Sequence, residues 1–150
     1  DFTKGEYSSG RARMIGERSH LIEKEVYTYL VSLYGEPFVH REFFFTDDKR
    51  NRTDFYIYHK SGNFSVDVFY PKDKRCLTGC LNSKLRNYSV NYQFKYPVIF
   101  LMMNREINEE TIRTILERKV NKLRPYQSLM TFNQFKKFCE GKTRIILDNK

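Results

Sequence analysis

The chain has 150 residues, of which 40% are hydrophobic and 30% are charged, and this composition is typical of one globular domain. A domain of this length buries most of its apolar surface without disulfides or a structural metal. The longest apolar run, residues 96–103, is too short to span a bilayer, so we expect no membrane partner. The cysteine count of three is odd, which argues against a disulfide framework and favours a reducing, intracellular compartment.

Most of the positive charge, which gives a net charge of +9, lies in two stretches of the sequence. Residues 72–95 contain six Lys or Arg and one Asp, and residues 119–150 contain eight Lys or Arg and two acidic residues. Clustered positive charge indicates a polyanionic partner, most often nucleic acid. The alternative is a basic surface that is simply solvated.

The first half of the chain predicts an arm, a helix and three strands. Residues 1–15 lack periodicity and are rich in Gly, Ser and Arg, so we expect a flexible basic arm before a single domain over residues 16–150. The next apolar residues follow helical spacing and predict a helix that ends at Gly35. The segments that then predict the strands of an antiparallel meander are 37–46, 53–60 and 64–71.

The second half predicts helices that alternate with strands. Leucines at helical spacing predict a helix over residues 76–92, and the apolar run that follows predicts a strand buried on both faces. A patterned helix over 107–123, a short strand at 126–132 and a last helix ending at Gly141 complete the chain. The predicted order, α-β-β-β-α-β-α-β-α, is that of an α/β fold built on a mixed sheet.

Two aspartates on neighbouring predicted strands are the candidate site. Asp67 lies inside an apolar strand, and Asp54 opens the strand before it, across a tight turn. Two carboxylates this close are costly unless a cation lies between them or one stays protonated, and oxygen ligands on a rigid sheet suit Mg²⁺. Alternatively, Asp54 caps a turn and Asp67 pairs with a nearby Lys or Arg.

This arrangement of acids resembles the PD-(D/E)XK nuclease family, which has the restriction-endonuclease-like fold. The resemblance covers about residues 16–140, with Glu23 on the first helix, Asp54 at the start of the second strand and Asp67 within the third. On the first helix, Glu17 or Glu25 could serve in place of Glu23. It implies a mixed sheet in α-β-β-β-α-β order with further C-terminal helices. It also implies that Asp54, Asp67 and the carbonyl of Val68 bind Mg²⁺, or Mn²⁺ in its place, and that Glu23 supports the metal.

The chain departs from the family pattern at one position. The family's lysine lies two residues after the third-strand acid, where this sequence has Phe69. Lys84 and Tyr88 are spaced i, i+4 on the following helix, and some family members place a Gln-x-x-x-Tyr pair there that faces the site. Lys84 is therefore a candidate to replace the missing lysine, the alternative being an ordinary exposed lysine.

The function that these residues predict is a Mg²⁺-dependent DNA endonuclease of the homing, restriction or repair type. The residues expected to contact nucleic-acid phosphates are Lys72, Lys74, Arg75, Arg86, Lys136 and Lys137. Because cutting both strands of DNA usually needs two active sites, a homodimer or larger complex is the natural expectation. The alternatives are a nucleic-acid-binding or assembly domain whose site has decayed at Phe69 and, more distantly, a protein-interaction domain.

Overall fold

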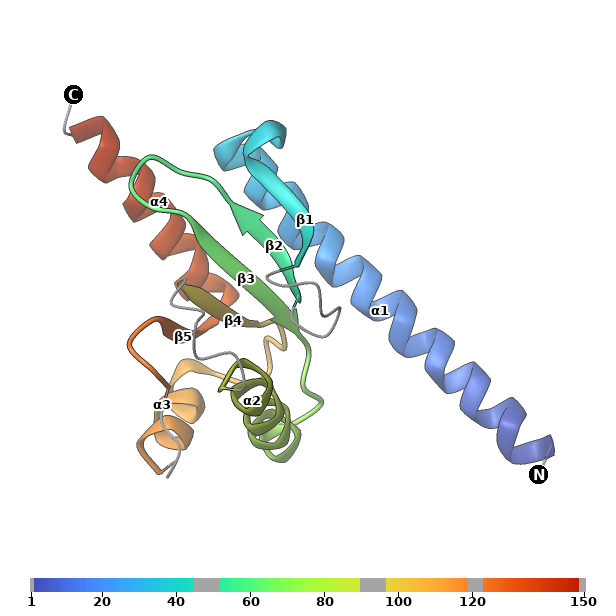
Figure 1. The fold of residues 1–150 in the computed structure, drawn as a ribbon. Helices are drawn as coiled ribbons and strands as arrows, with labels where there is room; N and C mark the ends of the chain where they lie inside the picture. The colour runs from blue at the N-terminus through green and yellow to red at the C-terminus, as the bar shows by residue number, and fades with distance from the viewer. Residues whose placement is uncertain (1, 45–51, 90–96, 119–122, 149–150) are drawn as a thin grey trace.

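A computed structural model gives the structure of the chain and describes the backbone of residues 2–44, 52–89, 97–118 and 123–148. Helices alternate with strands after an initial meander, as Figure 1 shows, which confirms the predicted α/β class. The elements are α1 (Phe2–Tyr34), the 3-10 helix η1 (Glu36–Phe38), β1 (Val39–Phe44), β2 (Arg52–Ile57), β3 (Phe64–Phe69), α2 (Lys74–Ser89), β4 (Val98–Met102), α3 (Glu109–Arg118), β5 (Gln127–Thr131) and α4 (Phe132–Asp148).

The strands form one mixed sheet in the order β1-β2-β3-β4-β5. The first three strands pair antiparallel, whereas β4 pairs parallel with both β3 and β5. This pattern follows from the connections, because short links give antiparallel neighbours and crossover helices return the chain to a parallel strand. The C-terminal ends of β3, β4 and β5 therefore lie at the same edge of the sheet.

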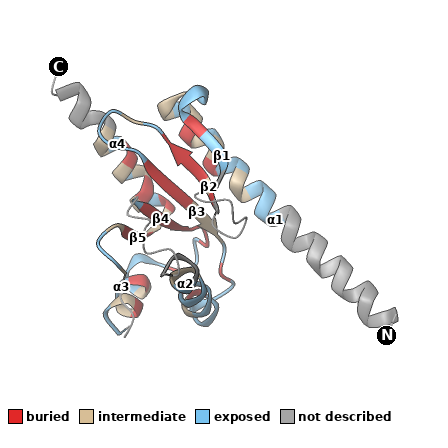
Figure 2. Ribbon diagram, viewed as in Figure 1, coloured by how far each residue is buried: buried red, intermediate tan, exposed pale blue. Residues whose placement is uncertain are grey.

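Helices cover both faces of the sheet. On one face, α1 packs against β1–β3 and α4 against β4 and β5, with Leu30 and Phe135 fully buried in the core between them. On the other face, Leu77 and Leu81 of α2 pack with residues of α3 and β4 in a second core cluster. All five residues of β4 are buried, which explains its uninterrupted apolar sequence (Figure 2).

The ends of two helices differ from their predicted positions. Residues 2–15 belong to α1, so the irregular conformation expected for the arm was wrong. No proline interrupts this segment, and its Arg, Ala, Met and Glu residues favour helix enough to offset two glycines. At the other end of the chain, α4 continues through Gly141 to Asp148 because Gly141 lacks the positive φ of a helix-ending glycine.

The predicted end of α1 at Gly35 is confirmed. Gly35 has a φ of 95°, and its N–H donates to the carbonyl of Val31 at 2.9 Å. A side chain is strained at such a φ, which is why glycine suits this position. Among the helices that the structure describes, none is long and apolar enough to cross a membrane.

The packing of α4 on the sheet predicts how the fold responds to a core deletion. Phe135 is 0% exposed, so Phe135→Ala should lower the free energy of unfolding by about 3–5 kcal/mol, measured by urea denaturation. Phe38→Ala is the matched control, because this ring is 52% exposed and should cost less than about 1 kcal/mol. Equal effects of the two substitutions would contradict the packing of α4 against the sheet.

Candidate active site

The pairing of β2 with β3 stops short of the two aspartates. The ladder joins residues 55–57 to residues 64–66 and does not pair Asp54 with Asp67, although both strands are described over this region. By strand alternation, both aspartates lie on the face of the sheet that α2 covers. The strands therefore part at the point where the two carboxylates face each other.

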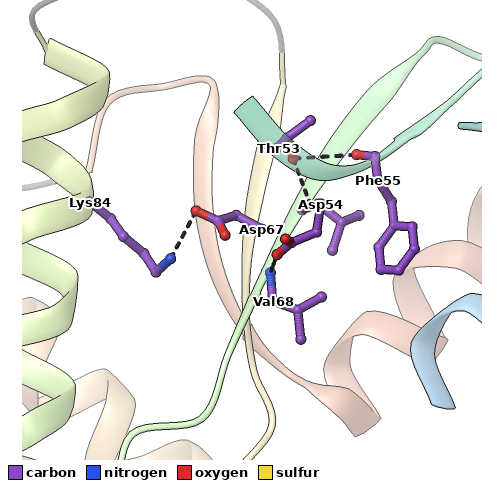
Figure 3. Close-up of polar contacts among 7 residues, drawn as sticks. Thr53, Asp54, Phe55, Asp67, Val68 and Lys84 are labelled. Atoms are coloured by element: carbon purple, nitrogen blue, oxygen red, sulfur yellow. Dashed lines mark hydrogen bonds and ion pairs between the residues drawn. The ribbon is translucent and has the colours of Figure 1, made fainter. Parts of the chain in front are cut away.

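Side chains bond to the backbone where the strands part. The amide of Val68 donates to Oδ2 of Asp54 at 2.6 Å, and the hydroxyl of Thr53 donates to the carbonyl of Val66 at 2.6 Å (Figure 3). Thr53 is fully buried, and this bond gives its hydroxyl a partner. These bonds fix the orientation of the Asp54 carboxylate without closing the gap between the strands.

Lys84 of α2 contacts Asp67 directly. Its Nζ lies 2.9 Å from Oδ2 of Asp67, and the two side chains are only 19% and 16% exposed (Figure 3). The same Nζ lies 5.0 Å from the centre of the Phe69 ring, so the residue at the family's lysine position packs beneath a lysine from another element. The structure thus brings Asp54, Asp67 and Lys84 together, and the alternative of an exposed Lys84 was wrong.

The direction of Lys84 follows from its place on α2. Leu77, Leu81 and Lys84 are spaced i, i+4 and i+7, so they share one side of the helix. Because both leucines are fully buried against the sheet, the lysine that follows them also points toward it. The helix begins at Lys74 after Asp73, whose Oδ1 accepts a hydrogen bond from the N–H of Cys76 at 2.8 Å and caps the first turn.

Burial and negative charge raise the pKa of Asp54 to about 7. Loss of hydration is the largest cause, the charge of Asp67 is the second, and Glu23 adds a smaller contribution. The hydrogen bond from Val68 acts in the opposite direction. Near neutral pH, Asp54 therefore holds a proton for much of the time unless a cation compensates its charge.

The two carboxylates fit a divalent cation that the protein holds by few ligands. Mg²⁺ often binds through one or two carboxylates and completes its coordination with water and substrate oxygens. A bound cation would relieve the repulsion between Asp54 and Asp67 that raises the pKa of Asp54. Over the part of the chain that is described, no group of three or more His, Cys, Asp or Glu side chains is placed to hold a metal.

The other residues expected near the metal have looser links to the pair. Glu23 on α1 is partly buried and influences Asp54 through its charge, but it does not form a three-acid cluster with the aspartates. At Val68, the group that contacts an aspartate is the amide, whereas the family resemblance implies a role for the carbonyl. The side chain of Tyr88 lies outside the described residues.

The predicted phosphate-contacting residues fall on two faces of the molecule. Those on the α2 side are exposed, and they are Lys72, Lys74, Arg75 and Arg86. Lys136 and Lys137 lie on α4, across the sheet, so the structure does not bring the two basic groups together. Lys136 is partly buried, with its Nζ 4.3 Å from the centre of the Phe132 ring, which leaves Lys137 as the exposed member.

Two polar residues that support the site were not predicted from the sequence. Thr53 precedes Asp54, and the only indication of its role in the sequence is a hydroxyl residue next to the acid. Asn104 is 3% exposed, and its Nδ2 donates to the carbonyls of Pro71 at 2.8 Å and Lys72 at 3.2 Å. Asn104 therefore holds the segment that links β3 to α2. The only indication of this role in the sequence is a single amide residue directly after the apolar run 96–103.

Comparisons with protein-family models, with curated proteins and with solved structures found no match for the chain. The candidate site is therefore defined by the geometry of this chain alone. It consists of two carboxylates where neighbouring strands part and a lysine that the adjacent helix supplies.

The raised pKa of Asp54 predicts how stability depends on pH without a divalent cation. Because the pKa is about 7 in the folded chain and about 3.9 in the unfolded chain, the folded state binds more protons between these values, and the free energy of unfolding falls as pH rises through them. Asp54→Asn removes this loss and keeps an acceptor for Val68. We expect the variant to match the parent near pH 4 and to exceed it by on the order of 2 kcal/mol at pH 8.

Urea denaturation in EDTA at several pH values measures this difference. Glu117→Gln is the control, because it removes an exposed carboxylate of α3 and should follow the parent at every pH. If the Asp54→Asn variant is instead less stable than the parent at pH 8, the charge of Asp54 does not destabilise the folded chain, and the prediction is wrong.

Proposed function

We propose that this domain is a Mg²⁺-dependent endonuclease that hydrolyses phosphodiester bonds in DNA. The observation that carries the proposal is the 2.9 Å contact between Lys84 and Asp67, in a site where Phe69 occupies the position of the nuclease family's lysine. A lysine that reaches the same carboxylate from α2 supplies the charge that the motif lacks. Cleavage of both strands would use two copies of the site, so the proposal includes a homodimer or larger assembly.

The arrangement of the sheet supports a restriction-endonuclease-like fold. Three antiparallel strands are followed by a crossover helix and a parallel strand, and the acids occupy the second and third strands. This is the α-β-β-β-α-β order that the resemblance implies. The resemblance and the position of the acids together favour phosphodiester chemistry over other uses of a mixed α/β sheet.

The residues of the chain divide the work of hydrolysis. Asp54 and Asp67 would hold the cation, and the N–H of Val68 keeps the Asp54 carboxylate oriented. Bound Mg²⁺ supplies charge that polarises the phosphodiester. The ammonium of Lys84, kept in place by Asp67 and the Phe69 ring, would orient the attacking water and stabilise the negative charge that builds up in the transition state.

The exposed basic residues of the α2 side would position the nucleic acid over the site. Lys72, Lys74, Arg75 and Arg86 lie on the loop and helix that also hold Lys84, so phosphates bound there run close to the acid pair. Such contacts release counterions, and affinity then falls steeply as salt rises. Lys136 and Lys137 lie across the sheet and would need a nucleic acid that wraps around the domain.

A second candidate function is nucleic-acid binding without cleavage. The observation that favours it is the same ion pair, because the ammonium of Lys84 neutralises Asp67 in the absence of a metal. With Phe69 at the motif position, the acid pair would then serve as a structural network. Metal binding and cleavage separate the two candidates.

Metal binding can be measured without activity. At pH 8, adding Mg²⁺ to ten times its dissociation constant should stabilise the parent by about 1.4 kcal/mol, because the cation binds only where both carboxylates are held together. Asp67→Asn should lose this response, and Glu117→Gln should keep it. A parent whose stability is unchanged by Mg²⁺ and by Mn²⁺ would exclude the metal site and favour the binding-only function.

Cleavage of supercoiled plasmid in Mg²⁺ tests the nuclease itself. We expect Asp67→Asn and Lys84→Ala each to reduce the rate by about 100-fold or more, since each removes a charge that acts in the transition state. Lys60→Ala is the control for loss of a lysine, because this residue is exposed in the turn between β2 and β3. Full activity of Lys84→Ala would show that the lysine of α2 does not replace the missing one.

A further inference from the structure

A pocket of about 610 Å³ lies at the C-terminal ends of β4 and β5. Neither aspartate nor Lys84 lines it, so it is separate from the acid pair. Its apolar wall consists of buried residues, and these are Met102, Met103, Ile107 and Phe132. The volume is in the range of small-ligand sites and is ample for a single nucleobase.

The pocket is bonded to the segment that follows Asp67. Phe69 of β3 pairs with Met102 of β4, and the N–H of Met103 donates to the carbonyl of Phe69 at 2.9 Å. Asn104 in the pocket wall donates to the carbonyl of Pro71 at 2.8 Å. Since neighbouring strands are about 4.8 Å apart, β4 and β5 lie roughly 5–10 Å from β3. Asp67 lies opposite Phe100, two residues before the pocket begins at Met102, which adds about 7 Å along the strand. The total of roughly 10 Å is on the scale of one or two nucleotides from a phosphate at the acid pair.

The charges around the pocket favour a neutral occupant. Glu109 and Glu110 line its rim, and Arg105, the basic residue of the lining, forms an ion pair with Glu25 of α1. A phosphate placed there would meet two carboxylates and an arginine that already has a partner. An uncharged planar group avoids this repulsion and buries its faces against the apolar wall.

Two amide side chains on the rim of the pocket can form hydrogen bonds with the edge of an uncharged planar ligand. Asn133 is exposed on the first turn of α4, and Asn108 lies across the pocket at the start of α3. The Oδ1 of Asn108 accepts a hydrogen bond from the N–H of Thr111 at 2.8 Å, so a ligand bond from this side chain would come from its amide nitrogen as a donor. Amide side chains pair well with the donors and acceptors on base edges.

We propose that this pocket takes one unpaired nucleobase, next to the phosphodiester held at the acid pair. The inference rests on the proposed nucleic-acid function and specifies its substrate. The preferred substrate is a nucleic acid in which a base is already out of the duplex stack, such as a bulge, a damaged site or a single-stranded junction, because extrusion of a paired base costs a few kcal/mol.

Binding measured without cleavage tests the pocket. Fluorescence anisotropy in EDTA compares three duplexes: one intact, one with a single bulged thymidine and one with a bulged abasic nucleotide that has the same backbone. Parent protein should bind the bulged thymidine on the order of tenfold more tightly than the bulged abasic site, which is the scale of one stacked base. The abasic duplex controls for the flexibility that any bulge introduces.

A pocket-filling variant assigns the effect to this site. Asn133→Trp, at an exposed position of the rim, should abolish the preference for thymidine over the abasic site and leave binding of the intact duplex unchanged. Glu140→Trp places the same ring at an exposed position two turns along α4 and should retain the preference.

The outcomes separate the pocket from the proposed function. If the parent binds all three duplexes equally with a steep salt dependence, or if Asn133→Trp keeps the preference, the pocket takes no base while the nucleic-acid function stands. If the parent binds none of the duplexes, both the nucleic-acid function and the pocket proposal fail.

Discussion

Repulsion between two carboxylates organises the region around Asp54 and Asp67. Two negative charges on facing strand positions, shielded from water, cost free energy that the structure offsets by the Lys84 ammonium and the Val68 amide. Each compensating group comes from a particular place: the amide from the point where β3 leaves its partner, and the ammonium from the inward side of α2. The parting of the strands, the inward direction of Lys84 and the raised pKa of Asp54 all accompany this one unfavourable pair.

The fold holds this arrangement in place because β3 and the inner side of α2 pack against buried elements. β3 pairs in parallel with β4, whose residues are all buried, and α2 is anchored by two leucines without exposed surface. Ionisable groups held in fixed positions on such a frame keep their separation when the protonation state changes. This rigidity is what a site needs to bind a small, strongly hydrated cation with geometric selectivity.

The element order and the partnership of the two acids could be read from the sequence, because both depend on local patterns. Alternation, turn residues and leucine spacing set the strands and helices, and the tight turn between β2 and β3 fixes which residues face each other. The ion pair of Lys84 was only one of two alternatives, since a single lysine beside a leucine stripe does not reveal which way it points. Packing decided it, through Leu77 and Leu81.

Other features depend on contacts between distant segments and left little trace in the sequence. The buried roles of Thr53 and Asn104 require knowing which backbone carbonyls lie within reach of each side chain, and this follows from how distant segments of the chain pack together. The helical conformation of residues 2–15 was missed because glycine and serine content outweighed the absence of proline. The separation of Lys137 from the α2 cluster arises because the crossover helices α2 and α3 cover one face of the sheet, whereas α4 follows the last strand and packs on the other face.

Because Lys84 lies on a helix instead of on the strand beside its acid, the site is divided between two elements of the fold, the sheet and α2. A lysine two residues after Asp67 would move with that acid, whereas Lys84 moves with α2 and with the exposed basic residues on it. Phosphates bound at those basic residues would therefore be joined to the acid pair through a single helix, whose Lys84 ammonium contacts Asp67.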